Sequence, residues 1–135
     1  MNSCASINDE VITKYNELIL GHISKGIIIK FSDDFKEVVF EDSFNGESFE
    51  DYINKFPQDD CRYGVYDFSY MDNKENKKNK IFFISWCPVE TKIKNKIVHT
   101  ATEQSIYKKL VGIDAIIKAT DNTEISQSLV EERCK

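Results

Sequence analysis

The segment KIFFISW, residues 80–86, places the strongest constraint on the fold. Its apolar and aromatic residues follow one another without the polar alternation of a strand that has one face in water. The segment therefore predicts a strand buried on both faces, which ends before Pro88. Such a strand needs packed elements above and below the sheet.

The first part of the chain predicts a helix and then a hairpin. Residues 6–21 have helical periodicity, with Ser6 or Asn8 as the N-cap and a glycine at the end. Residues 25–31 and 37–42 are rich in β-branched and aromatic side chains, and the SDDFK segment between them has turn chemistry. Two antiparallel strands are expected here.

The remaining patterns complete a mixed α/β domain. We expect a short helix that ends near Pro57, an aromatic strand, a lysine-rich loop or exposed hairpin end, a last strand, and a final helix that starts at Asp121 and Glu124. The predicted fold is α/β (α+β), with a central mixed β-sheet of about five strands and helices on both faces, in one domain over residues 1–135. The short helix is expected at residues 48–56, the aromatic strand at 61–70, the loop or hairpin end at 71–80, the last strand at 114–120 and the final helix at 121–130.

Composition excludes several classes of function. The formal net charge of −5 argues against general nucleic-acid binding, which needs a basic surface. No apolar run approaches the roughly 18 residues that span a bilayer. The cysteines form no CxxC pair, so reduced thiols of a cytosolic protein are favoured over disulfides or a zinc site. They stand at positions 4, 61, 87 and 134.

A lysine-rich segment, residues 91–110, predicts a long helix with two apolar faces. On a helical wheel of about 100° per residue, one face carries a core stripe of Val98, Thr102, Ile106 and Leu110. The opposite face gathers Ile93, Ile97, Thr100 and Gln104, with Ala101, Lys94, Lys96 and Lys108 around them. One sheet can cover only one of these faces. The second face either packs beneath the terminal segments or binds a partner.

Several segments together resemble the actin-depolymerising factor (ADF)/cofilin family, in its order and spacing. They are DDCRYGVYDFSY, KKNKIFFISWCP, KIKNKIVHTATE and, near the start, SINDEVITKYNEL. The resemblance covers nearly the whole chain and implies the ADF-homology fold, a sheet between pairs of helices. It also implies binding to monomeric and filamentous actin, filament turnover, no cofactor, no catalysis, and a monomer in the cytoplasm and cytoskeleton.

The resemblance assigns roles to particular positions. The long helix and the N-terminal segment would contact the actin monomer, and Ser3 would be a phosphorylation switch because added negative charge would weaken docking. Phosphoinositide lipids would bind weakly at overlapping basic residues. The expected monomer-binding residues are Ser3, Ile93, Lys94, Lys96, Ile97, Ala101, Gln104 and Lys108, and the expected filament-binding residues are Lys78, Lys80, Arg133 and Lys135.

Three departures from the family pattern predict modest filament severing. His99 stands where an aromatic residue normally packs inside, Glu103 reverses a charge near the binding face, and Glu132 replaces a basic residue near the chain end. These changes should weaken filament contacts more than the monomer contact.

Other functions remain open on the same residues. Neither His22 nor His99 pairs with a nucleophile or carboxylate at a readable spacing, so an enzyme is not expected. A protein of the glia maturation factor type, which binds the actin-related branching complex, is one alternative. A module recruited by phosphoinositides is another.

Overall fold

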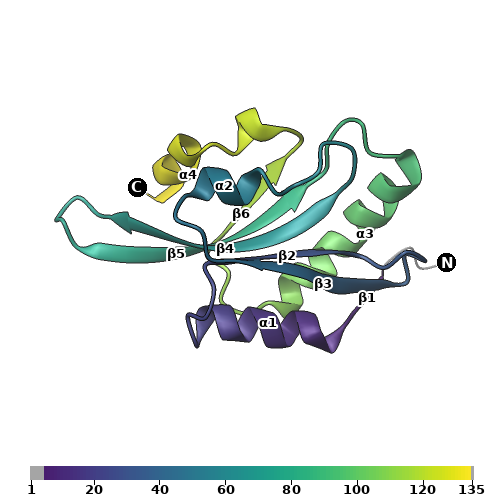
Figure 1. Cartoon of the computed structure of the whole chain (residues 1–135), viewed down its shortest axis with the longest axis horizontal. Helices are drawn as coiled ribbons and strands as arrows, with labels where there is room; N and C mark the ends of the chain where they lie inside the picture. Colours follow the sequence, from purple (N-terminus) through teal and green to yellow (C-terminus); the bar gives the residue numbers. More distant parts are fainter. Residues whose placement is uncertain (1–4, 135) are drawn as a thin grey trace.

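A six-stranded mixed sheet forms the centre of the protein, in a computed structural model that describes residues 5–134 (Figure 1). The strand order is β1-β3-β2-β4-β5-β6. The inner pairs are antiparallel, whereas β1 pairs with β3, and β6 with β5, in parallel. The strands are β1 (Ser6–Ile7), β2 (Gly26–Phe31), β3 (Glu37–Phe44), β4 (Arg62–Met71), β5 (Lys77–Trp86) and β6 (Ala115–Ala119).

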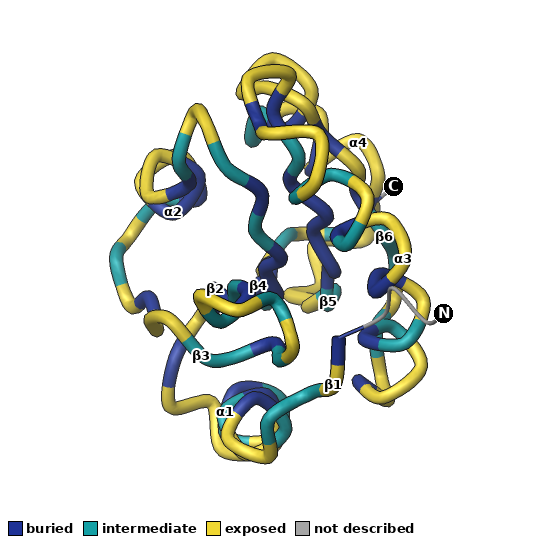
Figure 2. The backbone as a smooth tube through the Cα atoms, turned by 90° about the vertical axis from the view of Figure 1, so that its right-hand side faces the viewer, coloured by how far each residue is buried: buried dark blue, intermediate teal, exposed yellow. Residues whose placement is uncertain are grey.

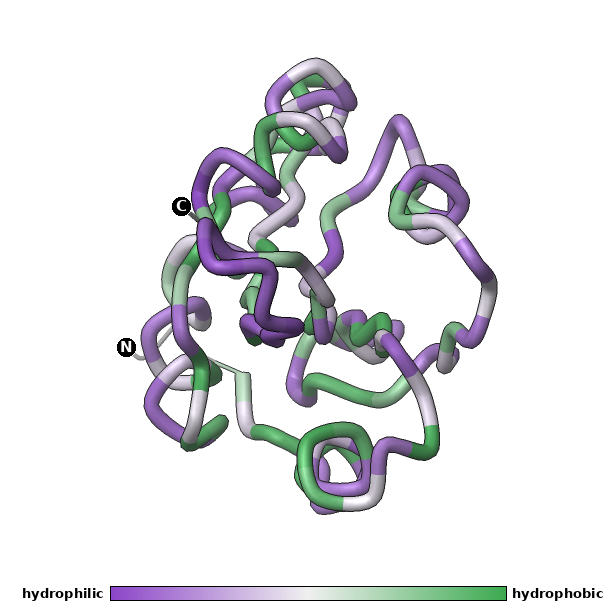
Figure 3. The backbone as a smooth tube through the Cα atoms, turned by 90° about the vertical axis from the view of Figure 1, so that its left-hand side faces the viewer, coloured by the Kyte–Doolittle hydropathy of each residue, from purple (hydrophilic) through white to green (hydrophobic). Residues whose placement is uncertain are grey.

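Helices cover both faces of this sheet, as predicted. The helices α1 (Asp9–Ile19) and α3 (Ile93–Lys109) lie on one face. The other face carries α2 (Phe49–Ile53), the 3-10 turn η1 (Asn122–Glu124) and α4 (Gln127–Cys134). Each face has its own buried cluster, and buried segments line the sheet between the helices (Figure 2). Seen nearly end-on, α1 carries hydrophobic and hydrophilic residues around its turns, as an amphipathic surface helix does (Figure 3).

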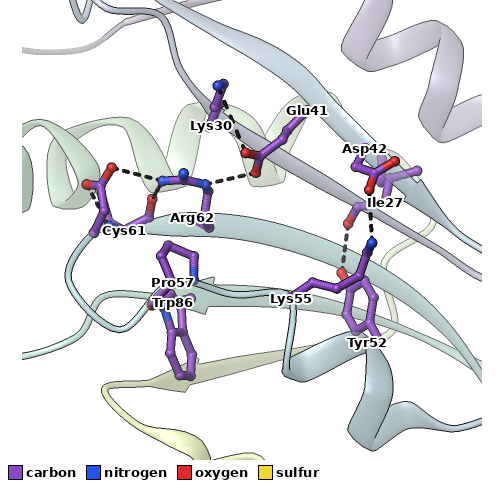
Figure 4. A network of polar contacts seen from close by, with 11 residues as sticks. Ile27, Lys30, Glu41, Asp42, Tyr52, Lys55, Pro57, Cys61, Arg62 and Trp86 are labelled. Carbon is purple, nitrogen blue, oxygen red and sulfur yellow. Dashed lines mark hydrogen bonds and ion pairs between the residues drawn. The ribbon is translucent and has the colours of Figure 1, made fainter.

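The strand β5 is buried on both faces over its second half, which confirms the prediction for KIFFISW. Phe82, Ile84 and Trp86 pack toward α2 and α4, while Phe83 packs toward α1 and α3. The Trp86 indole also donates a hydrogen bond of 2.7 Å to the Pro57 carbonyl (Figure 4). The strand β5 therefore ties the two layers of helices together.

The sheet has one strand more than the five predicted. The first helix begins at Asp9, because the Asn8 side chain accepts a hydrogen bond from the Glu10 amide and so caps it. Ser6 lies before the helix and pairs with β3, its amide donating to the Lys36 carbonyl. A two-residue strand has no periodicity of its own, so only tertiary pairing reveals it.

The lysine-rich segment is a hairpin end, one of the two forms predicted for it, but its turn is shorter than the segment. The strand β5 already begins at Lys77, and Asp72 accepts hydrogen bonds from the amides of the turn. Asp121 caps the turn η1 instead of the final helix, and Glu124 bonds back to Thr120. Cys61 lies just before β4 and Cys87 just after β5, not inside the strands. They and Cys134 are free thiols; Cys4 lies outside the described residues.

A candidate partner-binding surface on helix α3

The inner face of α3 packs against the sheet where the wheel predicted it. Thr102 and Ile106 are buried, as is Leu110 at the C-cap, and Val98 is half-buried. The chain leaves the helix through Gly112, whose positive φ of 107° favours glycine. The buried stripe fixes the rotation of the helix and so decides which residues face outward.

The outer face of α3 carries exposed apolar side chains. Ile93 is 76% exposed and Ile97 is 56% exposed, and Ala101, Gln104 and Lys108 are exposed along the same side. We call these five residues the α3 strip. No described segment of the chain covers the two isoleucines, so packing beneath the terminal segments, one of the two possibilities left by the sequence, does not occur within residues 5–134.

The lysines at the edge of the α3 strip are held by specific contacts. The Lys94 ammonium lies 5.7 Å from the centroid of the Phe35 ring, a cation–π geometry. The Lys96 ammonium donates a hydrogen bond of 2.8 Å to the Val89 carbonyl. The sequence pattern missed Phe35, because it lies in the β2–β3 turn, far from the helix in the chain. These contacts hold positive charge on both sides of exposed apolar surface.

The predicted filament-binding residues form a second group, at the end of the β4–β5 hairpin and α4. The Lys80 ammonium donates to the Arg133 carbonyl at 3.0 Å, and the Arg133 guanidinium donates to the Ile116 carbonyl at 3.1 Å. Lys78 lies on the same side of β5 and pairs with Asp72 at 3.6 Å. The hairpin projects away from the N-terminal end of α3, so the two groups are separate surfaces (Figure 1). Ser3 and Lys135 lie outside the described residues.

A cavity beside Arg133 was not anticipated from the sequence. It has a volume of about 490 Å³ and lies between β6 and the last helix. Its lining combines apolar and charged side chains; the lining residues are Ile117, Glu124, Leu129, Val130, Glu132 and Arg133. Leu129, 42% exposed, belongs to this surface.

Glu103 does not face the α3 strip, so the predicted charge reversal at the binding face is wrong. Its carboxylate accepts a hydrogen bond of 2.5 Å from Ser85 and pairs with Lys118 of β6 at 2.9 Å. Burial opposes ionisation of Glu103, but the hydrogen bonds from Ser85 and Lys118 outweigh it and lower its pKa. The side chain is therefore an internal anion that links α3 to β5 and β6.

His99 and Ser85 complete this internal cluster but form no catalytic site. The His99 Nε2 and Ser85 Oγ atoms are 2.8 Å apart, and both residues are buried. Ser85 lies between His99 and Glu103, whereas nucleophilic catalysis needs the base between the nucleophile and the acid. Burial lowers the pKa of His99 to about 4, so the ring is neutral near pH 7.

Neither a membrane span nor a metal site is found in residues 5–134. None of the helices there has the length and apolar character needed to cross a bilayer. That same part of the chain holds no group of three metal-ligating side chains. The α3 strip combines exposed apolar side chains with flanking lysines, which are features of a partner site.

Comparisons with known proteins agree with this geometry. The model of the family described as cofilin/tropomyosin-type actin-binding protein matches residues 4–135. Actophorin of Acanthamoeba castellanii is 39% identical over 131 residues, which cover 96% of this chain and 94% of that protein. Cofilin of Mycosarcoma maydis is 36% identical, covering 98% and 96%, and actin-depolymerizing factor 3 of Zea mays is 34% identical, covering 98% and 96%.

Solved structures share the whole fold. The cofilin crystal structure from Streptomyces griseoflavus superposes with a TM-score of 0.90 at 29% identity and covers 97% of each chain. Glia maturation factor from Caenorhabditis elegans superposes with a TM-score of 0.79 at 17% identity, covering 96% of this chain and 95% of that one, which shows the fold alone. The family match over nearly the entire chain confirms the resemblance seen in the sequence: this chain belongs to the cofilin/tropomyosin-type actin-binding proteins, the ADF/cofilin family.

Proposed function

We propose that this chain binds actin monomers through the α3 strip and promotes the depolymerisation and turnover of actin filaments. The observation that carries the proposal is the exposure of Ile93 and Ile97 on one helix face between ordered lysines. Fully burying an isoleucine is worth about 1.5–3 kcal/mol, so two of them supply a large share of a micromolar affinity. This is a non-enzymatic role, as is usual in the family.

Filament contact uses the second surface in this proposal. Lys78, Lys80 and Arg133, with Lys135 beyond the described residues, would meet a further actin subunit. We also propose that severing is modest, because Glu132 adds an exposed negative charge next to Arg133. Glu103 no longer supports this proposal, since it is buried. Severing as strong as that of a typical family member would contradict it.

Regulation and location follow from the same proposal. A phosphate on Ser3 would add about −1.5 to −2 charge near the lysines that flank the α3 strip and weaken docking. We further propose that the chain acts as a monomer at the cytoplasmic actin cytoskeleton and binds phosphoinositides only weakly. Liposome co-sedimentation with and without acidic phosphoinositides tests the lipid contact separately.

The decisive experiment removes the apolar contacts without disturbing the fold. The double variant Ile93→Ala, Ile97→Ala should bind actin monomers at least tenfold more weakly than wild type. The matched control is Leu20→Ala, Val111→Ala, which also truncates two exposed apolar side chains, each 77% exposed and outside the α3 strip. It should bind as wild type does. Equal binding by both variants, or capture of the branching complex instead of actin by wild type, would overturn the proposal.

A further inference from the structure

Residues 5–8, the described part of the N-terminal segment, are attached to α3 by a hydrogen bond between residues 97 positions apart. The Ala5 amide donates to the Thr102 hydroxyl oxygen at 3.1 Å. Both residues are buried, Ala5 at 5% exposure and Thr102 at 0%. A threonine on the inner face of a helix could be replaced by valine if it served packing alone, because the two side chains have nearly the same shape. The Ala5 contact gives the hydroxyl a separate role.

Other contacts hold the same segment to the sheet but not to the helix. The Ser6 amide donates to the Lys36 carbonyl at 3.0 Å, and the Asn8 amide donates to the Val38 carbonyl at 2.9 Å. These bonds form the β1–β3 pairing, and β1 runs between α1 and α3 (Figure 2). The bond to Thr102 attaches the segment to the helix that carries the strip.

Thr102 also lies at the same height along the α3 axis as part of the α3 strip. It follows Ala101 directly and precedes Gln104 by two residues, and both of those neighbours belong to the α3 strip. The Thr102 side chain is buried, whereas the Ala101 and Gln104 side chains are exposed, so Thr102 bonds to the segment without occupying the partner surface. The bond therefore joins residues 5–8 to the helix that our proposed function places against an actin monomer.

We propose that Thr102 is a positioning residue, which holds residues 5–8 against α3 so that these residues and the α3 strip meet the partner as one preorganised surface. This inference rests on the proposed function and adds a residue to it that does not itself touch actin. Preorganisation raises affinity because a segment that is already in place loses less conformational freedom on binding.

The attachment itself can be tested without actin. Thr102→Val removes the acceptor and keeps the shape, whereas Thr102→Ser keeps the hydroxyl. Amide hydrogen exchange at Ala5 should accelerate about two- to tenfold in Thr102→Val and stay close to wild type in Thr102→Ser. Thr100→Val makes the same chemical change at an exposed site on the same helix and should leave Ala5 unchanged. Equal exchange in Thr102→Val and wild type would overturn the proposal.

The functional link is tested by actin binding of the same variants. Thr102→Val should weaken monomer binding about two- to tenfold, whereas Thr102→Ser should bind as wild type does. Wild-type affinity in Thr102→Val, despite faster exchange at Ala5, means that the attachment does not serve binding, and the proposal is wrong. If the wild-type chain binds no actin, the proposed function fails, while the exchange result still decides the attachment.

Discussion

The imidazole ring of His99 lies flat against the phenol ring of Tyr63, with centroids 4.2 Å apart and planes 7° from parallel. The Tyr63 hydroxyl also donates a hydrogen bond of 2.5 Å to the His99 carbonyl. Both the ring and the backbone of His99 are thereby tied to β4. The histidine occupies the internal place where the family pattern predicts an aromatic side chain, and it does so as a neutral ring.

A buried neutral histidine makes stability depend on pH. The unfolded chain binds a proton at His99 near the ordinary pKa of about 6.5, whereas burial lowers the folded pKa to about 4, and the carboxylates of Glu103 and Asp60 oppose this only in part. Between these values the unfolded state holds more protons, so stability falls as pH drops from 6.5 to 4, by up to about 3 kcal/mol. Urea unfolding at pH 7.0, 5.5 and 4.5 measures this loss.

The matched variant for this prediction is His99→Phe, which keeps a ring against Tyr63 and cannot titrate. It should be less stable than wild type at pH 7, because Ser85 loses one partner, yet its stability should fall less on acidification. Glu103, whose pKa is lowered in the fold, still contributes a loss at lower pH in both proteins. Parallel pH profiles for the two proteins would show that His99 does not carry the effect.

The sequence predicted the inner stripe of α3 because helical periodicity reports which residues share a face. The same periodicity placed Ile93 and Ile97 on the opposite face, but it left open whether another segment covers them. It failed for Glu103, whose direction depends on Lys118, a partner on another element. The contact of Lys80 with Arg133 joins positions 53 apart, which no local pattern encodes. Only the family resemblance grouped those two residues.

The buried position of Glu103 predicts a stability effect in place of a binding effect. Glu103→Lys would place a cation beside Lys118 and leave Ser85 without its carboxylate acceptor, at a cost of about 2–3 kcal/mol. The cost is below that of a fully buried pair because Lys118 is largely exposed. Glu132→Lys makes the same exchange on the surface and should leave the unfolding free energy within about 0.5 kcal/mol of wild type. Similar thermal stability in both variants would contradict this assignment.

The lysines at the edge of the α3 strip should contribute to affinity in a salt-dependent way. Each rim charge is worth about 0–1 kcal/mol, so Lys94→Ala, Lys96→Ala should weaken monomer binding up to about tenfold at low salt and less at high salt. Lys109→Ala, an exposed lysine in the last turn of α3 outside the predicted site, serves as the control. Titration of labelled actin monomers at two salt concentrations measures the difference, and a salt-independent loss would point to helix damage.

Gly64 lies in β4 near the centre of the sheet, where there is no space for a larger side chain. A Cβ atom at this position would overlap the Tyr52 hydroxyl and lie 2.8 Å from the Phe56 ring. The Tyr52 hydroxyl donates to the Ile27 carbonyl at 2.7 Å and so bonds α2 to β2 (Figure 4). Gly64→Ala should therefore cost about 1–3 kcal/mol of unfolding free energy. Adding Tyr52→Phe removes the overlapping oxygen, so the double variant should lose less than the two single losses combined.

Substitutions at the surface around Arg133 should weaken filament binding without weakening monomer binding. The Arg133 guanidinium donates to the Ile116 carbonyl on the edge strand β6, and its backbone carbonyl accepts from the Lys80 ammonium, so the side chain ties α4 to β6 while Lys80 ties α4 to the hairpin. Lys78→Ala, Arg133→Ala should lower co-sedimentation with filaments several-fold and leave monomer affinity unchanged, because the α3 strip lies elsewhere. Lys74→Ala at the exposed hairpin turn controls for lost charge. Parallel losses in both assays would instead mean that the two surfaces act on actin as one.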